Sequence, residues 1–175
     1  PMTSKPQTTR ENVKAIYNDD ESQIIFVDTP GIFKPHGKLG TILLKTAKSS
    51  LEGVDVIVYV VAADEAPNFE LTQLLSKIDI PIILAYNKID KVNVKIGEDR
   101  LSRYLNSFGK KAIDVVHLSA KNGYGLDDLL SKIKALLPFG QEEYSTEIVS
   151  DRPREYIISE MIREQCMIFL KELLF

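Results

Sequence analysis

Ile82-Ile83-Leu84-Ala85-Tyr86, followed at once by Asn87-Lys88-Ile89-Asp90, is the stretch that decides the fold class of this 175-residue chain. The first part is a continuous apolar run, which predicts a strand buried inside a sheet. The second part places hydrogen-bonding side chains directly after that strand. In open α/β sheets, ligands bind beyond the carboxyl ends of the strands. The stretch therefore predicts a buried strand that ends in a ligand-binding loop.

Two other apolar runs are followed by polar motifs in the same way. Asp28-Thr29-Pro30-Gly31 follows the run Ile24 to Val27, and Ser119-Ala120-Lys121 follows the run Ile113 to Leu118. Helical spacing of apolar residues separates the later runs. This alternation predicts an α/β fold of the P-loop NTPase type, with a mostly parallel sheet and helices on both faces.

The predicted elements divide the chain into three parts. The run 54–63 is rich in β-branched residues, which is the pattern of a central parallel strand. We expect a nucleotide-binding domain over 1–140, a polar linker over 141–150, and the start of a second domain over 151–175, which opens with a helix. The remaining predicted strands lie at 13–17, 23–27, 80–86 and 112–118, and the predicted helices at 68–77, 97–108 and 126–136.

Composition excludes some classes of function. Hydrophobic residues make up 44% and charged residues 27% of the chain, which is typical of a soluble globular protein. The net charge of -3 provides no overall basic field of the kind that DNA-binding proteins use, so we expect no DNA partner.

The motif Asn87-Lys88-Ile89-Asp90 suits guanine for a chemical reason. The Asp90 carboxylate can accept hydrogen bonds from both the ring N1–H and the exocyclic amine, and adenine lacks this pair of donors. Asn87 would bridge neighbouring loops, and the alkyl stem of Lys88 would lie on the base. Ser119-Ala120-Lys121 would offer backbone N–H groups to the guanine oxygen. Solvated turns use the same residue types, but the two motifs together favour a guanine site.

The earlier motif predicts contacts to phosphate and metal. Asp28 can hold Mg²⁺ through water, and the N–H of Gly31 can reach a terminal phosphate. Thr9, beside Arg10, is the candidate for sensing that phosphate and coordinating Mg²⁺. Thr9, Asp28 and Gly31 are thus the candidate catalytic residues, and Thr9 and Asp28 the candidate metal ligands. An ordinary turn closed by Pro and Gly, with solvated threonines, is the alternative.

Five segments together resemble the Era family of translation-factor-class GTPases. Ser4-Lys5-Pro6-Gln7-Thr8-Thr9-Arg10 resembles its first switch, and Asp28-Thr29-Pro30-Gly31-Ile32 its second. Asn87-Lys88-Ile89-Asp90 and Ser119-Ala120-Lys121 resemble its base-recognition loops. Asp151-Arg152-Pro153-Arg154-Glu155 is similar to the segment that leads into its C-terminal RNA-binding KH domain.

The resemblance implies a function that the residue patterns alone do not. It implies binding of GTP or GDP with Mg²⁺, slow GTP hydrolysis, and binding to small-subunit ribosomal RNA during assembly of the 30S subunit. It also implies a cytoplasmic protein that associates peripherally with the inner face of the cell membrane. Ile32 occupies the position where many GTPases carry a Gln that orients water, so intrinsic hydrolysis should be slow.

The chain departs from the family pattern in two places. The 175 residues contain no Gly-x4-Gly-Lys-Ser/Thr phosphate loop, and only the first helix of a KH domain is present. We therefore expect that these residues belong to an Era-type GTPase but include neither its phosphate loop nor most of its KH domain. By themselves they should not hydrolyse GTP. A Der-like or MnmE-like GTPase and a catalytically dead protein- or RNA-binding module are the alternatives.

Overall fold

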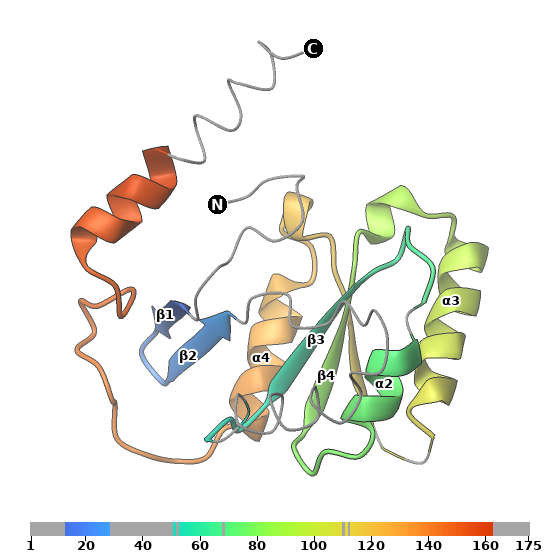
Figure 1. The fold of residues 1–175 in the computed structure, drawn as a ribbon, viewed down its shortest axis with the longest axis horizontal. Coiled ribbons are helices and arrows are strands. Elements are labelled where there is room, and N and C mark those ends of the chain that lie inside the picture. The colour runs from blue at the N-terminus through green and yellow to red at the C-terminus, as the bar shows by residue number, and fades with distance from the viewer. Residues whose placement is uncertain are drawn as a thin grey trace, which may run out of the picture. The chain divides into compact units, whose positions relative to one another are not determined.

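Two sheets form in the part of the chain that the structure describes. The computed structural model describes residues 13–28, 51, 53–67, 69–109, 111 and 113–162. One sheet is an antiparallel pair, β1-β2, and the other is three-stranded with the order β3-β4-β5 (Figure 1). The hairpin belongs to one compact unit with residues 140–162, while the three-stranded sheet and its helices form the other unit.

The three-stranded sheet is parallel and has β4 at its centre. Strands β3 (Ile57–Ala62), β4 (Ile82–Asn87) and β5 (Asp114–His117) pair in parallel, with Leu84 of β4 opposite Tyr59 and Val115. Every side chain of β4 from Ile82 to Tyr86 is buried. The predicted buried strand and the mostly parallel sheet are therefore confirmed, since each face of β4 is covered.

Helices cover both faces of this sheet. Helices α2 (Phe69–Leu75) and α3 (Val94–Ser107) lie on one side of the strands in Figure 1, and α4 (Leu126–Leu136) lies on the other. Leu84 and Tyr86 pack with residues of α3 in one buried cluster. Because side chains alternate along a strand, the buried residues Ile83 and Ala85 face the opposite side of the sheet, where α4 packs on β4.

The start of α3 differs from its predicted position, whereas α4 has its predicted bounds. The pattern of apolar residues predicted that α3 begins at Gly97, but the helix begins at Val94. The side chain of Asn93 accepts a hydrogen bond from the backbone N–H of Lys95, which caps the helix three residues earlier. Capping by a polar side chain leaves no trace in an apolar periodicity, so the pattern missed this first turn.

Strand β3 does not have the central position that its sequence predicts. Among the described residues it pairs with β4 alone. Val60, in the middle of the strand, is 58% exposed. The uniformly apolar composition of β3 is that of a strand with two neighbours, so the prediction of a central strand is not met in the described sheet.

The antiparallel hairpin is built from β1 (Val13–Asn18) and β2 (Gln23–Asp28), joined by a turn. In the turn, the Asp19 carboxylate accepts hydrogen bonds from the backbone N–H groups of Glu21 and Ser22. Residues 143–151 run beside β1, where the N–H of Ile16 donates to the carbonyl of Val149 at 3.0 Å. A helical segment follows over 154–162. The domain boundaries at 140 and 150 stay a prediction.

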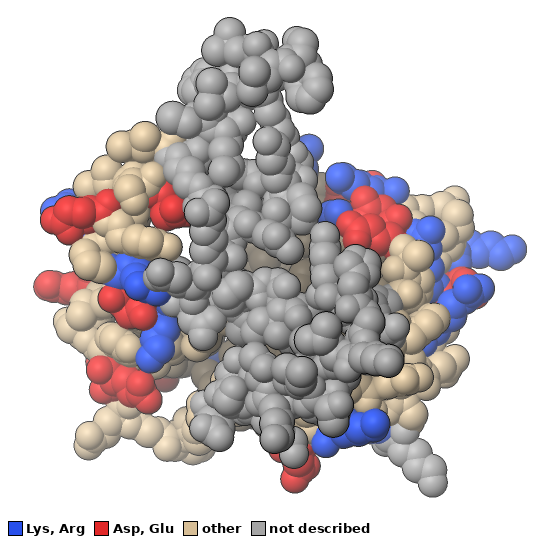
Figure 2. Space-filling model, viewed as in Figure 1, with Lys and Arg blue, Asp and Glu red and all other residues tan. Residues whose placement is uncertain are grey.

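The described surface carries mixed charge. Acidic and basic side chains are interspersed over the described residues that are visible in Figure 2, in keeping with the small net charge. Within the described ranges, none of the helices is both long enough and apolar enough to cross a membrane.

Candidate nucleotide-binding site

Asn87 joins the two loops in which a guanine site is predicted. It is the last residue of β4, and its Oδ1 accepts hydrogen bonds from two backbone N–H groups. One belongs to Lys88, at 2.8 Å, and the other to Ala120 in the neighbouring loop, at 3.0 Å. A single amide oxygen therefore sets the spacing between the two loops, as the sequence predicted for this residue.

Ser119 and Asp90 form a second link between the loops. The buried Ser119 Oγ donates a hydrogen bond of 2.6 Å to Asp90 Oδ1, and the Asp90 side chain is exposed. This hydrogen bond is the main reason that the pKa of Asp90 lies below its ordinary 3.8, and the charges of Lys91 and Lys121 act in the same direction. Asp90 thus presents an ionised carboxylate to solvent, which can accept hydrogen bonds from a ligand.

Short 3-10 helices shape both loops. One comprises Ile89–Lys91 and the other Ala120–Asn122. The N–H of Ile89 donates to the carbonyl of Leu118 at 3.2 Å, and that of Ser119 to the carbonyl of Tyr124 at 3.1 Å. These main-chain contacts hold the loops in place, while Ala120 and Lys121 stay exposed at their surface.

The predicted phosphate and metal contacts fall mostly outside the described residues. Thr9 and the segment Thr29-Pro30-Gly31-Ile32 lie outside them, and Asp28 is described only as the last residue of β2. No group of three or more His, Cys, Asp or Glu side chains that could hold a metal lies within the described residues. The roles of Thr9, Asp28 and Gly31 remain predictions.

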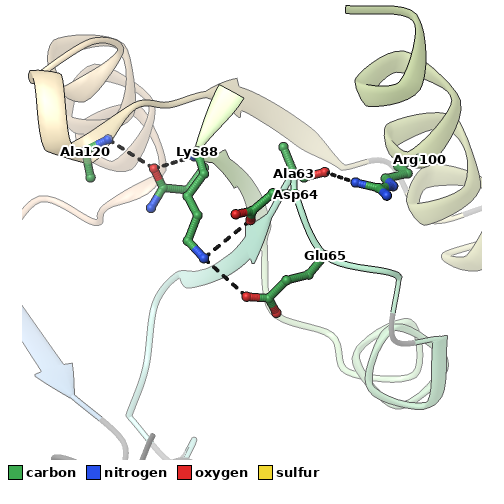
Figure 3. Close-up of polar contacts among 7 residues, drawn as sticks. Ala63, Asp64, Glu65, Lys88, Arg100 and Ala120 are labelled. Atoms are coloured by element: carbon green, nitrogen blue, oxygen red, sulfur yellow. Dashed lines mark hydrogen bonds and ion pairs between the residues drawn. The ribbon is translucent and has the colours of Figure 1, made fainter. Parts of the chain in front are cut away.

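Three residues of the site were missed by the sequence reasoning. Figure 3 shows the carboxylates of Asp64 and Glu65 reaching the ammonium group of Lys88, and Arg100 bonded to the carbonyl of Ala63. The available signal was the pair of acidic residues directly after the apolar run that ends at Ala63. Strand β3 ends beside β4, which brings that pair next to Lys88.

The first half of the chain, residues 1–88, matches the model of a protein family described as 50S ribosome-binding GTPase. The chain belongs to this family. A curated member of similar sequence is GTPase Era from Lactobacillus delbrueckii subsp. bulgaricus, which is 41% identical over 170 residues. That alignment covers 94% of this chain and 55% of the relative.

Solved structures of this GTPase family give the same result. An Era in complex with MgGDPNP and nucleotides 1506-1542 of 16S ribosomal RNA is 30% identical, with a TM-score of 0.78, over 95% of this chain and 57% of that one. Aquifex aeolicus Era bound to GDP.AlF4- is 32% identical and has the same TM-score of 0.78. That match covers 95% of this chain and 58% of the Aquifex chain. The chain thus spans about half the length of the relatives it matches, and its similarity to GTPase Era extends over nearly all of its own residues.

Proposed function

We propose that this chain supplies the guanine-recognition part of an Era-type GTPase that binds GTP and GDP with Mg²⁺ and acts in assembly of the small ribosomal subunit. The observation that carries the proposal is the double hydrogen bond to Asn87 Oδ1, which joins the two loops. With the loops joined in this way, the exposed residues Asp90, Ala120 and Lys121 form the rim that we assign to base recognition.

The chemistry of this rim favours guanine over adenine. Asp90 is ionised near neutral pH, and Ser119 lowers its pKa further, so its carboxylate can accept hydrogen bonds from the N1–H and the amine of guanine. Adenine carries no matching pair of donors. In Ser119-Ala120-Lys121, the N–H groups of Ser119 and Ala120 donate to Tyr124 and Asn87, which leaves the N–H of Lys121 as the candidate donor for the guanine oxygen. The Lys88 stem would cover the base.

Phosphate and metal contacts complete the proposal. Asp28 and Thr9 would hold Mg²⁺, and the N–H of Gly31 would contact the terminal phosphate. The neighbouring residues Thr29, Pro30 and Ile32 would belong to the same nucleotide-binding loop. The relatives bound to MgGDPNP and to GDP.AlF4- support a guanine nucleotide as the ligand, and the first of them also supports Mg²⁺. Because the 175 residues hold no Gly-x4-Gly-Lys-Ser/Thr motif, no GTP hydrolysis is expected from them alone.

The proposed partners are small-subunit ribosomal RNA and the 30S subunit. The support is the relative solved with nucleotides 1506-1542 of 16S ribosomal RNA. We place the protein in the cytoplasm, with peripheral association with the inner face of the membrane, as the family resemblance implies.

A test of the guanine site is an NMR titration of the chain with GDP, XDP and ADP, because NMR detects weak binding. GDP should shift the amide signals of Asp90, Ala120 and Lys121, and ADP should leave them in place. In Asp90→Asn the preference should move from GDP to XDP, with GDP affinity reduced about tenfold or more through the loss of charge-assisted hydrogen bonds.

The matched control is Asp99→Asn, which removes an exposed carboxylate that pairs with Arg103 on α3. It should bind GDP as the unchanged protein does. Equal responses of the Asp90→Asn variant and the unchanged protein to GDP and XDP would remove Asp90 from the base-recognition role.

A further inference from the structure

The backbone at Lys88 is held in a costly conformation. Its φ of 63° and ψ of 33° are left-handed, and Lys88 is the only non-glycine residue with positive φ in the described part of the chain. Such a conformation is unfavourable for a residue with a Cβ and persists where surrounding contacts enforce it. Here the N–H of Lys88 is bonded to Asn87 Oδ1, and its carbonyl accepts from the N–H of Lys91. The backbone thus fixes the direction in which the Lys88 side chain leaves the loop.

The far end of the same side chain is also held. Lys88 Nζ lies 3.3 Å from Asp64 Oδ1 and 3.2 Å from Glu65 Oε1, so two carboxylates share one ammonium group (Figure 3). The hydrogen bond that Lys88 donates to Glu65 is the main cause that raises the pKa of Lys88 above 10.5, and the Asp64 contacts add to it. The four-carbon stem is therefore stretched between two fixed ends.

The turn that carries the two carboxylates is anchored independently of Lys88. Ala63 is fully buried, and its N–H donates to the carbonyl of Asn87 at 2.8 Å. Its carbonyl accepts a hydrogen bond of 2.6 Å from Arg100 Nη1 on α3 (Figure 3). The N–H of Glu65 donates to the carbonyl of Ala62. The end of β3 is thus locked to β4 and to α3, and it presents Asp64 and Glu65 from a rigid support.

We propose that Asp64 and Glu65 are positioning residues that hold the Lys88 stem as a preformed wall of the base site, an inference that rests on the proposed function. A free lysine side chain would lose its rotamer freedom when a base packs on it, and that loss weakens binding. The two carboxylates order the stem before the nucleotide arrives. The side chains of Lys88 and Glu65 are 38% and 69% exposed, and ion pairs this open to solvent add little to fold stability. The role therefore concerns ligand affinity.

The test compares Asp64→Asn/Glu65→Gln with the control Glu98→Gln, which changes an exposed carboxylate on α3. Dissociation constants for GDP and XDP are measured by NMR titration, beside a thermal unfolding curve. The double variant should bind GDP about two- to tenfold more weakly, as expected when one long side chain must be ordered on binding. The ratio of GDP to XDP affinity and the unfolding midpoint should stay unchanged, because the carboxylates do not contact the base. The control should match the unchanged protein.

A second measurement shows whether the effect passes through Lys88. In a Lys88→Met background the stem remains but the ammonium group is absent, so adding Asp64→Asn/Glu65→Gln should cause no further loss of affinity. An equal loss in both backgrounds would overturn the inference, as would unchanged GDP affinity in the double variant. If instead Asp90→Asn fails to shift the base preference, the proposed guanine site itself is wrong. The two failures are therefore distinguishable.

Discussion

Asp90 is the residue whose chemistry depends most on a neighbour from another part of the chain. Its carboxylate belongs to the loop after β4, while its hydrogen-bond donor, Ser119, follows β5. The sequence predicted both residues as parts of the site but did not predict their contact. The contact lowers the pKa of Asp90 below 3.8 and fixes the position of the carboxylate.

Replacing Ser119 with alanine should raise the pKa of Asp90 toward 3.8. A carboxyl group whose pKa is lowered by folding stabilises the fold above its unfolded pKa. This contribution is lost as the pH falls through the folded value. In Ser119→Ala the folded and unfolded pKa values become similar, so this contribution should shrink. An NMR pH titration of the Asp90 carboxyl carbon measures this shift.

Ser131→Ala, on the exposed surface of α4, is the matched control, and it should leave the Asp90 titration unchanged. An unaltered Asp90 pKa in Ser119→Ala would show that the hydrogen bond is not what lowers the pKa of this carboxyl group.

At the scale of elements, the loop between β5 and α4 depends on two glycines with positive φ. Gly123 has a φ of 75° and Gly125 a φ of 78°. A Cβ at Gly123 would meet no atom, whereas a Cβ at Gly125 would collide with the carbonyl oxygen of His117. The close approach at Gly125 brings the start of α4 against the end of β5, directly behind the Ser119 to Asn122 loop.

Gly125→Ala should therefore destabilise the protein more than Gly123→Ala. The left-handed conformation costs an alanine roughly 1–2 kcal/mol at either position. At Gly125 the backbone of His117 must also move, which adds to that cost. Thermal unfolding should give a larger fall in Tm for Gly125→Ala. A fall of the same size in both variants would mean that the loop adapts to the added methyl group.

Within the hairpin unit, the described contacts join segments that are far apart along the sequence. The side chain of Gln23 accepts from the N–H groups of Glu143 and Tyr144 and donates to the carbonyl of Tyr144. Near the start of β1, at the other end of the hairpin, the N–H of Lys14 donates to Asp151 Oδ1 at 3.1 Å. The segment 143–151 is thus held to the hairpin at both of its ends.

Gln23→Ala should loosen this segment without unfolding the hairpin. It removes three hydrogen bonds to the segment 143–151 and a fourth to Asn18 within the hairpin. At about 1 kcal/mol net for each bond to the segment, the free energy of local opening should fall by about 1–3 kcal/mol. The backbone N–H of Ile16, whose acceptor is Val149, should then exchange faster with deuterium. Gln73→Ala, at an exposed position on α2, is the control, and protection of Ile16 equal to that in the unchanged chain would contradict the prediction.

The sequence by itself determined the parallel sheet around Ile82–Asn87 and singled out the two loops proposed for base recognition. Apolar runs and the motifs that follow them are local features, and the carboxyl ends of parallel strands meet at one edge. The cap at Asn93, the pairing of β3 with β4 and the support of Lys88 by Asp64 and Glu65 were decided only by the tertiary structure. They depend on which strands and helices become neighbours, and residues separated along the chain carry no local sign of that pairing.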